Sequence, residues 1–288
     1  MVASIVKDGY PGHRITRPTA WTAPYVFACP HAGRTYPTAF VEGTRLSLLD
    51  LRRSEDAYVD LLMPEAETAG VPVLTADFPR AFVDVNRAPY EMDPLLFDGP
   101  ISAERTRSNR VLAGFGVIPK LAAEGRAIYA RKLPAQEGRA RIKWCYEPYH
   151  AALRTLITEC LTLFGIATVI DWHSMPSATA GRSLPDIVFG DRFGASCGAG
   201  VVAAWEKNFR DAGFGTGRNS PYAGGYVTSL YGRPTEGVHV LQVEVNRGLY
   251  LDEGRVARSE GFEPLRARLG EVARGLLEGS TTYSFAAE

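Results

Sequence analysis

The chain has 288 residues, a length that suits one large domain or two small ones and that buries a substantial core without disulfide bonds or structural metal ions. Its 45% hydrophobic, 22% charged and 10% aromatic residues are close to the average of soluble globular proteins, which excludes disorder, a collagen helix or a coiled coil. The 32 basic and 32 acidic residues give a formal net charge of zero, so we expect no nucleic-acid or membrane partner, and an anionic ligand must be held by a few local arginines.

Short segments rich in β-branched and aromatic residues predict buried strands, and most of them run into polar residues, glycine or proline. The expected strands are 24–29, 71–76, 81–85, 166–172, 186–190 and 238–245. Apolar residues spaced three and four apart predict helices at 48–62, 102–124, 149–163, 196–211 and 262–276. The Gly-rich stretch 224–234 is expected to be a loop near the site. Strands that alternate with helices predict an α/β sandwich whose sheet is covered on both faces and whose site lies at the carboxyl ends of strands.

The domain organisation and the compartment are predicted from what the sequence lacks. No repeat and no Pro- or Ser/Gly-rich linker divides residues 1–288, which predicts a single domain. The four cysteines are too few for a disulfide framework and form no CxxC pair; they are Cys29, Cys145, Cys160 and Cys197. The first residues lack a basic segment followed by an apolar one, and no run of eighteen apolar residues occurs. We therefore expect a soluble cytoplasmic protein.

Two of the five histidines directly follow predicted strands. His31 comes after the strand 24–29, and His173 comes after 166–172. Imidazoles at the carboxyl ends of strands open into a cleft, and such a pair suits a metal such as zinc, provided that an acidic third ligand exists. The alternative is that each is a hydrogen-bonded loop histidine. His150, on a predicted helix, and His239, at a strand start, are interpreted as structural.

The segment SEDAYVDLL offers candidates for the acidic ligand. Asp56 and Asp60 lie four residues apart on one face of the predicted helix, and Glu55 is displaced from them. Helix capping is the alternative for Ser54, Glu55 and Asp56, and a solvated helix face is the alternative for Asp60.

Glu244 interrupts an otherwise apolar strand between Val243 and Val245. A carboxylate in a buried strand must be paired, bound to a metal, or shifted in its pKa. Glu244 is therefore a candidate functional residue, with a structural ion pair as the alternative. Asp171, two residues before His173, either supports that histidine or forms a plain hydrogen bond at the strand end.

Arg80 and Arg87 bracket the predicted strand 81–85. Guanidinium groups suit carboxylate ligands and developing oxyanions, and Asn86 adds further donors. The arginines are seven residues apart, so on an ideal strand their side chains would start on opposite faces. Spacing alone therefore does not establish a shared site.

Six blocks in order along most of the chain carry a resemblance to a known family. They are CPHAGRTYP (29–37), SEDAYVDLL (54–62), PRAFVDVNRAP (79–89), DWHSMPS (171–177), LPDIVFGDRFGASC (184–197) and GGYVTSLYGRPTEGVHVLQVEVNRGLYL (224–251). Together these blocks resemble the N-formylglutamate amidohydrolase family. That family is similar in fold to the zinc carboxypeptidases and to the acyl-aspartate and acyl-glutamate deacylases, which implies a three-layer sandwich with a mixed, mostly parallel sheet and helices on both faces.

The resemblance also implies a role for individual residues. It implies that His31, Asp56 and His173 bind zinc and that water completes the coordination. The relatives carry their acidic ligand three residues after the first histidine, where this chain has Arg34, so the acid must come from elsewhere and Glu55 competes with Asp56. A His–carboxylate–His set with an open position is a hydrolytic arrangement.

The remaining implied roles complete a catalytic site. The resemblance implies that Glu244 is the general base and proton shuttle and that Arg80 stabilises the tetrahedral oxyanion. It implies that Asn86 and Arg87 hold the α- or γ-carboxylate of the substrate.

The expected function is zinc-dependent hydrolysis of the N-formyl amide of N-formyl-L-glutamate to formate and L-glutamate, a step of histidine breakdown in the family. One alternative is an amidohydrolase for a different N-acyl amino acid or peptide, because small changes in the acyl pocket switch the substrate. A second alternative is a metal-free protein that binds an acidic amino acid. In each case the expected partner is a small anionic molecule, and the sequence leaves the oligomeric state open.

Overall fold

The computed structural model describes residues 12–101, 108–179 and 182–280. These residues divide into two compact units. The first unit holds 12–14, 30–57, 75–101 and 108–152, and the second holds 15–29, 58–74, 153–179 and 182–280. The expected single domain over 1–288 stays a prediction.

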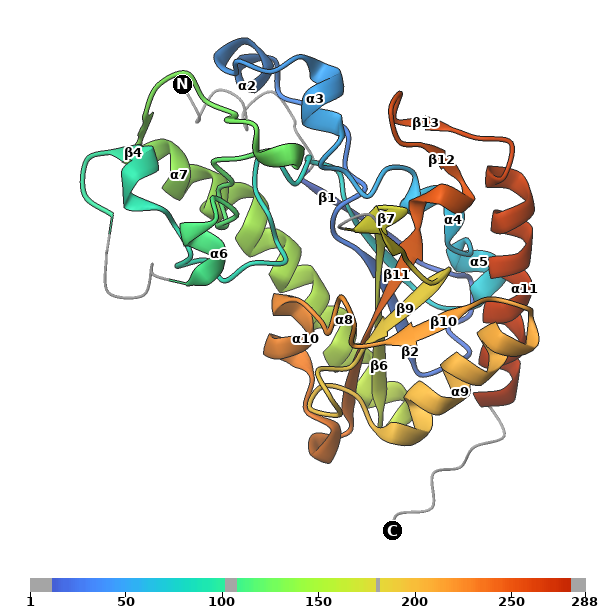
Figure 1. Cartoon of the computed structure of the whole chain (residues 1–288). Coiled ribbons are helices and arrows are strands. Elements are labelled where there is room, and N and C mark those ends of the chain that lie inside the picture. Colours follow the sequence, from blue (N-terminus) through green and yellow to red (C-terminus); the bar gives the residue numbers. More distant parts are fainter. Residues whose placement is uncertain (1–11, 102–107, 180–181, 281–288) are drawn as a thin grey trace. The chain divides into compact units, whose positions relative to one another are not determined.

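A mixed, mostly parallel sheet forms the centre of the fold (Figure 1). Among the described residues it has seven strands in the order β1-β3-β2-β6-β11-β9-β10. Their bounds are β1 His13–Thr16, β3 Val73–Ala76, β2 Tyr25–Cys29, β6 Ala167–Met175, β11 Val238–Asn246, β9 Ile187–Gly190 and β10 Thr216–Arg218. β6 runs parallel to both β2 and β11, β10 runs parallel to β9, and β9 runs antiparallel to β11. The predicted sheet type is confirmed.

Helices cover both faces of the sheet in the second unit. All nine residues of β6 and all nine of β11 are buried, as expected of central strands that are covered on both sides. In Figure 1 the helices α9 and α11 lie on one side of these strands, and α10 and most of α8 lie on the other. The helix bounds are α4 Val59–Leu62, α5 Ala66–Ala69, α8 Glu147–Phe164, α9 Ala199–Asp211, α10 Tyr226–Tyr231 and α11 Phe262–Ser280.

Aromatic side chains join α9 to one face of the sheet. The ring centroid of Trp172 on β6 lies 5.8 Å from that of Phe27 on β2 and 6.1 Å from that of Trp205 on α9. Successive residues of a strand point to opposite faces, so His173 lies on the face opposite Trp172. The aromatic core therefore occupies one face, and the polar residues next to Trp172 occupy the other.

The remaining described elements are short. In the first unit they are α2 Thr38–Gly43, α3 Leu48–Arg52, η1 Pro94–Leu96, β4 Phe97–Asp98, α6 Asn109–Leu112, η2 Ala123–Gly125, β5 Leu133–Pro134, α7 Ala135–Arg141 and the π-helical segment η3 Ile142–Tyr146. In the second unit they are β7 Ala178–Thr179, β8 Arg182–Ser183, η4 Pro234–Glu236, η5 Arg247–Leu249, β12 Leu251–Asp252 and β13 Ala257–Arg258. No helix among the described residues is long and apolar enough to cross a membrane.

The predicted strand 81–85 is wrong. These residues form turns, in which the Phe82 and Val83 amides donate to the carbonyl oxygen of Pro79. All five residues are buried, so the segment has the apolar composition of a buried strand. Its main-chain groups find their partners in side chains and loops instead of a neighbouring strand. The apolar composition of residues 81–85 reflects their burial, but composition alone cannot distinguish a buried strand from a buried turn.

Two predicted helices and one predicted loop are also corrected. The helix 48–62 is split into α3 and α4 by the turns 53–58, and Tyr58, just before α4, takes a left-handed conformation with φ 63°. Of the helix 102–124, residues 102–107 lie outside the described residues, and only α6 and the short η2 form in the remainder. The expected loop 224–234 contains α10.

Candidate metal centre

His31 lies in the loop that follows β2 and is buried, with 2% of its surface exposed. The loop passes close to the main chain of residues 76–78. A Cβ atom added to Gly33 would lie 2.1 Å from the carbonyl oxygen of Phe78, so only glycine permits this approach. The sequence HAG therefore fixes where the loop places the imidazole of His31.

Both ring nitrogens of His31 face carboxylates. Nδ1 lies 3.3 Å from Oδ2 of Asp56, and Nε2 lies 2.7 Å from Oδ1 of Asp84. The amide of Asp56 also donates to the carbonyl oxygen of His31 at 3.1 Å, which ties the two segments together. Asp56 lies between α3 and α4, so the expected position on a helical face is wrong, although the residue does reach His31.

The carboxylate of Asp84 lies close to both arginines of the turn 79–87. Nη2 of Arg80 lies 3.0 Å from its Oδ2, and Nε of Arg87 lies 3.9 Å from the same oxygen. Burial alone would raise the pKa of Asp84, but the adjacent His31, Arg87 and Arg80 hold it well below its usual value. Because the segment is not a strand, the seven-residue spacing does not separate the two arginines, and both reach one carboxylate.

Arg80 bridges two buried acids, since its Nη1 lies 3.6 Å from Oδ1 of Asp56. Arg87 is held by its main-chain surroundings, with Nε donating to the carbonyl oxygen of Phe115 at 3.0 Å and Nη1 to that of Asn86 at 2.9 Å. Asn86 is buried, and its amide donates to Oδ1 of Asp84 at 2.8 Å. The first unit therefore brings Arg80, Asn86 and Arg87 together around Asp84.

Glu55, the competing acidic ligand, binds other groups. Its carboxylate accepts hydrogen bonds from the hydroxyl of Tyr36 at 2.8 Å and from Nε of Arg52 at 3.2 Å. Burial raises the pKa of Glu55, and Arg52 partly offsets this. These contacts with Tyr36 and Arg52 indicate a structural role for Glu55.

Four polar side chains lie side by side on β6 and β11 in the second unit. His173 is paired in register with Glu244, and Asp171 is paired with Gln242. Nε2 of His173 lies 3.0 Å from Oδ2 of Asp171, and Nε2 of Gln242 donates to Oε1 of Glu244 at 2.7 Å. Asp171 therefore faces His173, and the carboxylate inferred to need a partner has Gln242.

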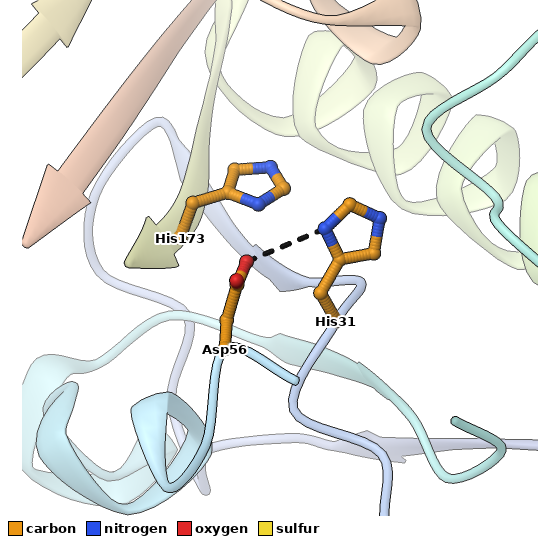
Figure 2. Close-up of side chains that lie close together, drawn as sticks. All are labelled: His31, Asp56 and His173. Carbon is orange, nitrogen blue, oxygen red and sulfur yellow. Dashed lines mark ion pairs between the residues drawn. The ribbon is translucent and has the colours of Figure 1, made fainter. Parts of the chain in front are cut away.

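His31, Asp56 and His173 form a buried group that could hold a metal ion. Each residue offers one ligand atom, and these atoms lie within 4.8 Å of one another. Figure 2 shows the Asp56 carboxylate pointing toward the two imidazole rings. Ligand atoms on one tetrahedral zinc ion lie about 3.4 Å apart, so small side-chain adjustments suffice. Two nitrogens and one carboxylate oxygen fit zinc.

The two histidines interpreted as structural do have hydrogen-bond partners in the fold. Nε2 of His150 lies 2.9 Å from the carbonyl oxygen of Val85. Nδ1 of His239 accepts the amide of Gly198, which precedes α9, at 3.0 Å.

Sequence reasoning did not single out Asp84 and Gln242. The position of each residue in the sequence could have indicated its role. Gln242 lies two residues before Glu244, and residues two apart on a strand share a face. Asp84 stands between the two candidate arginines, and a buried acid between two cations is their natural partner.

Comparisons with known proteins agree along most of the chain. The family model described as N-formylglutamate amidohydrolase matches residues 23–251. N-formylglutamate deformylases of Pseudomonas aeruginosa and Pseudomonas putida are 29% and 28% identical to this chain, and each match covers 88% of this chain and 92% of the relative. The crystal structure of N-formylglutamate amidohydrolase from Ralstonia eutropha is 33% identical with a TM-score of 0.87, covering 93% of this chain and 98% of that one. This chain belongs to the N-formylglutamate amidohydrolase family.

Proposed function

We propose that the protein is a zinc-dependent amidohydrolase that cleaves N-formyl-L-glutamate with water to formate and L-glutamate. The observation that carries this proposal is the buried His31, Asp56 and His173 group, with Glu244 in register with His173 on the adjacent strand. A carboxylate next to a three-ligand metal group is the arrangement that amide hydrolysis needs. The names of the relatives support the choice of substrate.

The two histidines would bind zinc through Nδ1. Nε2 of His31 faces Asp84 and Nε2 of His173 faces Asp171, so each carboxylate favours a proton on Nε2 and a lone pair on Nδ1. Zinc held by these residues would supply a Lewis acid and would lower the pKa of water to about 7.

Glu244 would move the proton during hydrolysis. Its carboxylate takes a proton from the attacking water and delivers it to the amide nitrogen as the bond between carbon and nitrogen breaks. The hydrogen bond from Gln242 to Oε1 at 2.7 Å orients the carboxylate for this transfer. The products are formate and the free amine of glutamate.

The cationic cluster would bind the rest of the substrate. Arg80 lies between Asp56 and Asp84, and its guanidinium is placed to donate to the oxyanion. Among the described residues, the hydrogen bonds of Arg87 use Nε and Nη1, which leaves its Nη2 amine for a carboxylate of the substrate. Asn86 adds an amide donor beside it.

A substrate panel tests the proposed function. Purified zinc-loaded protein is given the N-formyl, N-acetyl and N-succinyl derivatives of L-glutamate, together with N-formyl-L-leucine. We expect the highest kcat/KM with N-formyl-L-glutamate, because N-formyl-L-leucine has only one carboxylate for the cationic cluster of Arg80 and Arg87 to bind. Preference for another acyl group would assign a different amidohydrolase, and tight binding without hydrolysis of any compound would indicate a binding protein. A role in histidine breakdown stays a prediction.

A further inference from the structure

The helix that precedes and includes α8 contains a π-helical turn. α7, η3 and α8 follow one another without a break from Ala135 to Phe164, and η3 is the π-helical segment. Pro148 explains the wider turn, since it has no N–H to donate and its ring would clash with the carbonyl group four residues earlier in an α-helix.

Three side chains of this helix donate to carbonyl oxygens of the turn 82–87. Nη1 of Arg141 donates to Phe82 at 3.1 Å, and the hydroxyl of Tyr146 donates to Arg87 at 2.9 Å. Nε2 of His150 lies 2.9 Å from the carbonyl oxygen of Val85, where a carbonyl can only accept. We call Arg141, Tyr146 and His150 the clasp.

The π turn brings the first two members of the clasp onto one face. Arg141 and Tyr146 are five residues apart, and in an α-helix of about 100° per residue they would point about 140° apart. The i→i+5 hydrogen bonds of a π-helix make a wider turn, which narrows this angle, and both side chains reach the same segment. Tyr146 and His150 are four apart, and their rings lie in contact with centroids 4.3 Å apart and planes tilted by 37°.

The turn 82–87 needs such partners. Its residues from Phe82 to Asn86 are buried, but they belong to no strand, so no neighbouring strand pairs with their carbonyl groups. The same turn carries Asp84, Asn86 and Arg87, which pair with His31 or form the proposed carboxylate site. The clasp holds the main chain directly on both sides of Asn86, at Val85 and Arg87.

We propose that Tyr146 and His150 are positioning residues for substrate binding, which act by fixing the main chain that carries Asn86 and Arg87. The inference rests on the proposed function of that turn. The hydroxyl of Tyr146 does not touch the substrate in this account. Its loss lets the Arg87 main chain shift, which weakens the hold on the substrate carboxylate more than it affects the chemical step.

Steady-state kinetics of Tyr146→Phe test the proposal. We expect KM for N-formyl-L-glutamate to rise about tenfold, the equivalent of one lost hydrogen bond, while kcat changes by less than about threefold. His150→Leu should behave likewise, and His150→Gln, which keeps a donor, should restore much of the KM. The matched control is Tyr25→Phe, which removes the hydroxyl of a buried tyrosine on β2, away from the turn 82–87. A KM that is the same for Tyr146→Phe and Tyr25→Phe would overturn the proposal.

Hydrogen–deuterium exchange separates this proposal from the proposed function. The Asp84 amide donates to Val117 at 2.8 Å, and the Asn86 amide donates to Oδ1 of Asp84, so both report on the turn. We expect these amides to exchange about tenfold faster in Tyr146→Phe than in the wild type and in Tyr25→Phe. Unchanged exchange would overturn the clasp even in an active enzyme. Faster exchange in a protein that does not cleave N-formyl-L-glutamate would support the clasp and reject the proposed function.

Discussion

Both histidines of the candidate metal centre face a carboxylate through Nε2. Asp84 faces His31 at 2.7 Å, and Asp171 faces His173 at 3.0 Å. Such a carboxylate sets the tautomer of the imidazole and raises its basicity as a ligand. The proposed metal ligands His31 and His173 therefore depend on two acids, Asp84 and Asp171, that are not themselves in the proposed ligand set.

Asp84→Asn is predicted to weaken zinc binding. The amide keeps the size of the side chain but no longer carries the negative charge that faces His31 and Arg80, so zinc affinity should fall about 10- to 100-fold. Competition with a chelating dye measures the affinity without any assay of activity. Asp93→Asn is the matched control, because this buried acid pairs with Lys120. Equal zinc affinity in both variants would show that Asp84 does not support His31.

Glu244→Gln is predicted to lower kcat by at least about 100-fold, because an amide cannot accept the proton from water. The protein should keep its zinc, since Glu244 is not in the proposed ligand set. Metal analysis and kinetics on the same sample check both points, with Glu206→Gln, an acid paired with Arg210 and Arg218, as control. Loss of zinc from Glu244→Gln would identify Glu244 as a ligand instead of the base.

At the scale of elements, prediction succeeded where periodicity was long and uninterrupted. The strand 166–172 corresponds to β6, 238–245 to β11, and the helices 149–163 and 262–276 to α8 and α11. It failed at 81–85 and at 48–62, where a buried turn and a left-handed Tyr58 interrupt regular structure. In both segments the residues that misled the prediction lie in or next to the candidate site.

His239 on β11 accepts a hydrogen bond from the residue that precedes α9. We predict that this histidine makes the stability of the folded protein depend on pH. Burial lowers the pKa of His239 in the folded protein, so the neutral ring is favoured in the native state. Its Nδ1 accepts the amide of Gly198, and protonation would remove this acceptor next to the N-terminus of a helix. The stabilisation of the folded state by the neutral His239 ring is complete above pH 6.5, which is about the pKa of histidine in the unfolded chain. It is lost as the pH falls below that value.

Urea denaturation of wild type and His239→Asn at pH 7.5 and 5.5 measures this effect. Asparagine can keep the acceptor but does not titrate, so the variant should lose less stability on acidification. The difference grows by at most about 1.4 kcal/mol per pH unit, the limit for one proton. Parallel losses in the two proteins would mean that His239 does not titrate within this range.

In the molecule as a whole, the formal net charge is zero and the four cysteines are scattered along the chain. The structure buries all four thiols, and burial raises the pKa of Cys145, Cys160 and Cys197 to about 12, which makes them poor nucleophiles and poor metal ligands. The histidines and acids therefore remain as the candidates for metal chemistry.

The candidate site could be predicted only in part. His31 and His173 stood out because each follows a predicted strand, although β6 extends to Met175 and includes His173, and Glu244 stood out as an acid among valines. Asp84 did not stand out, because its role depends on the turn at 81–85, which the sequence pattern predicted to be a strand. The grouping of residues so distant along the chain came from the family resemblance, since no periodicity relates one loop to another.

Removal and return of the metal ion test whether hydrolysis depends on zinc. The purified protein is treated with a chelator, dialysed, and assayed for formate and glutamate release from N-formyl-L-glutamate before and after zinc is added back. We expect release to stop in the metal-free protein and to return, with equal amounts of both products, as zinc reaches about one ion per chain. Full activity in protein that contains no metal would contradict it.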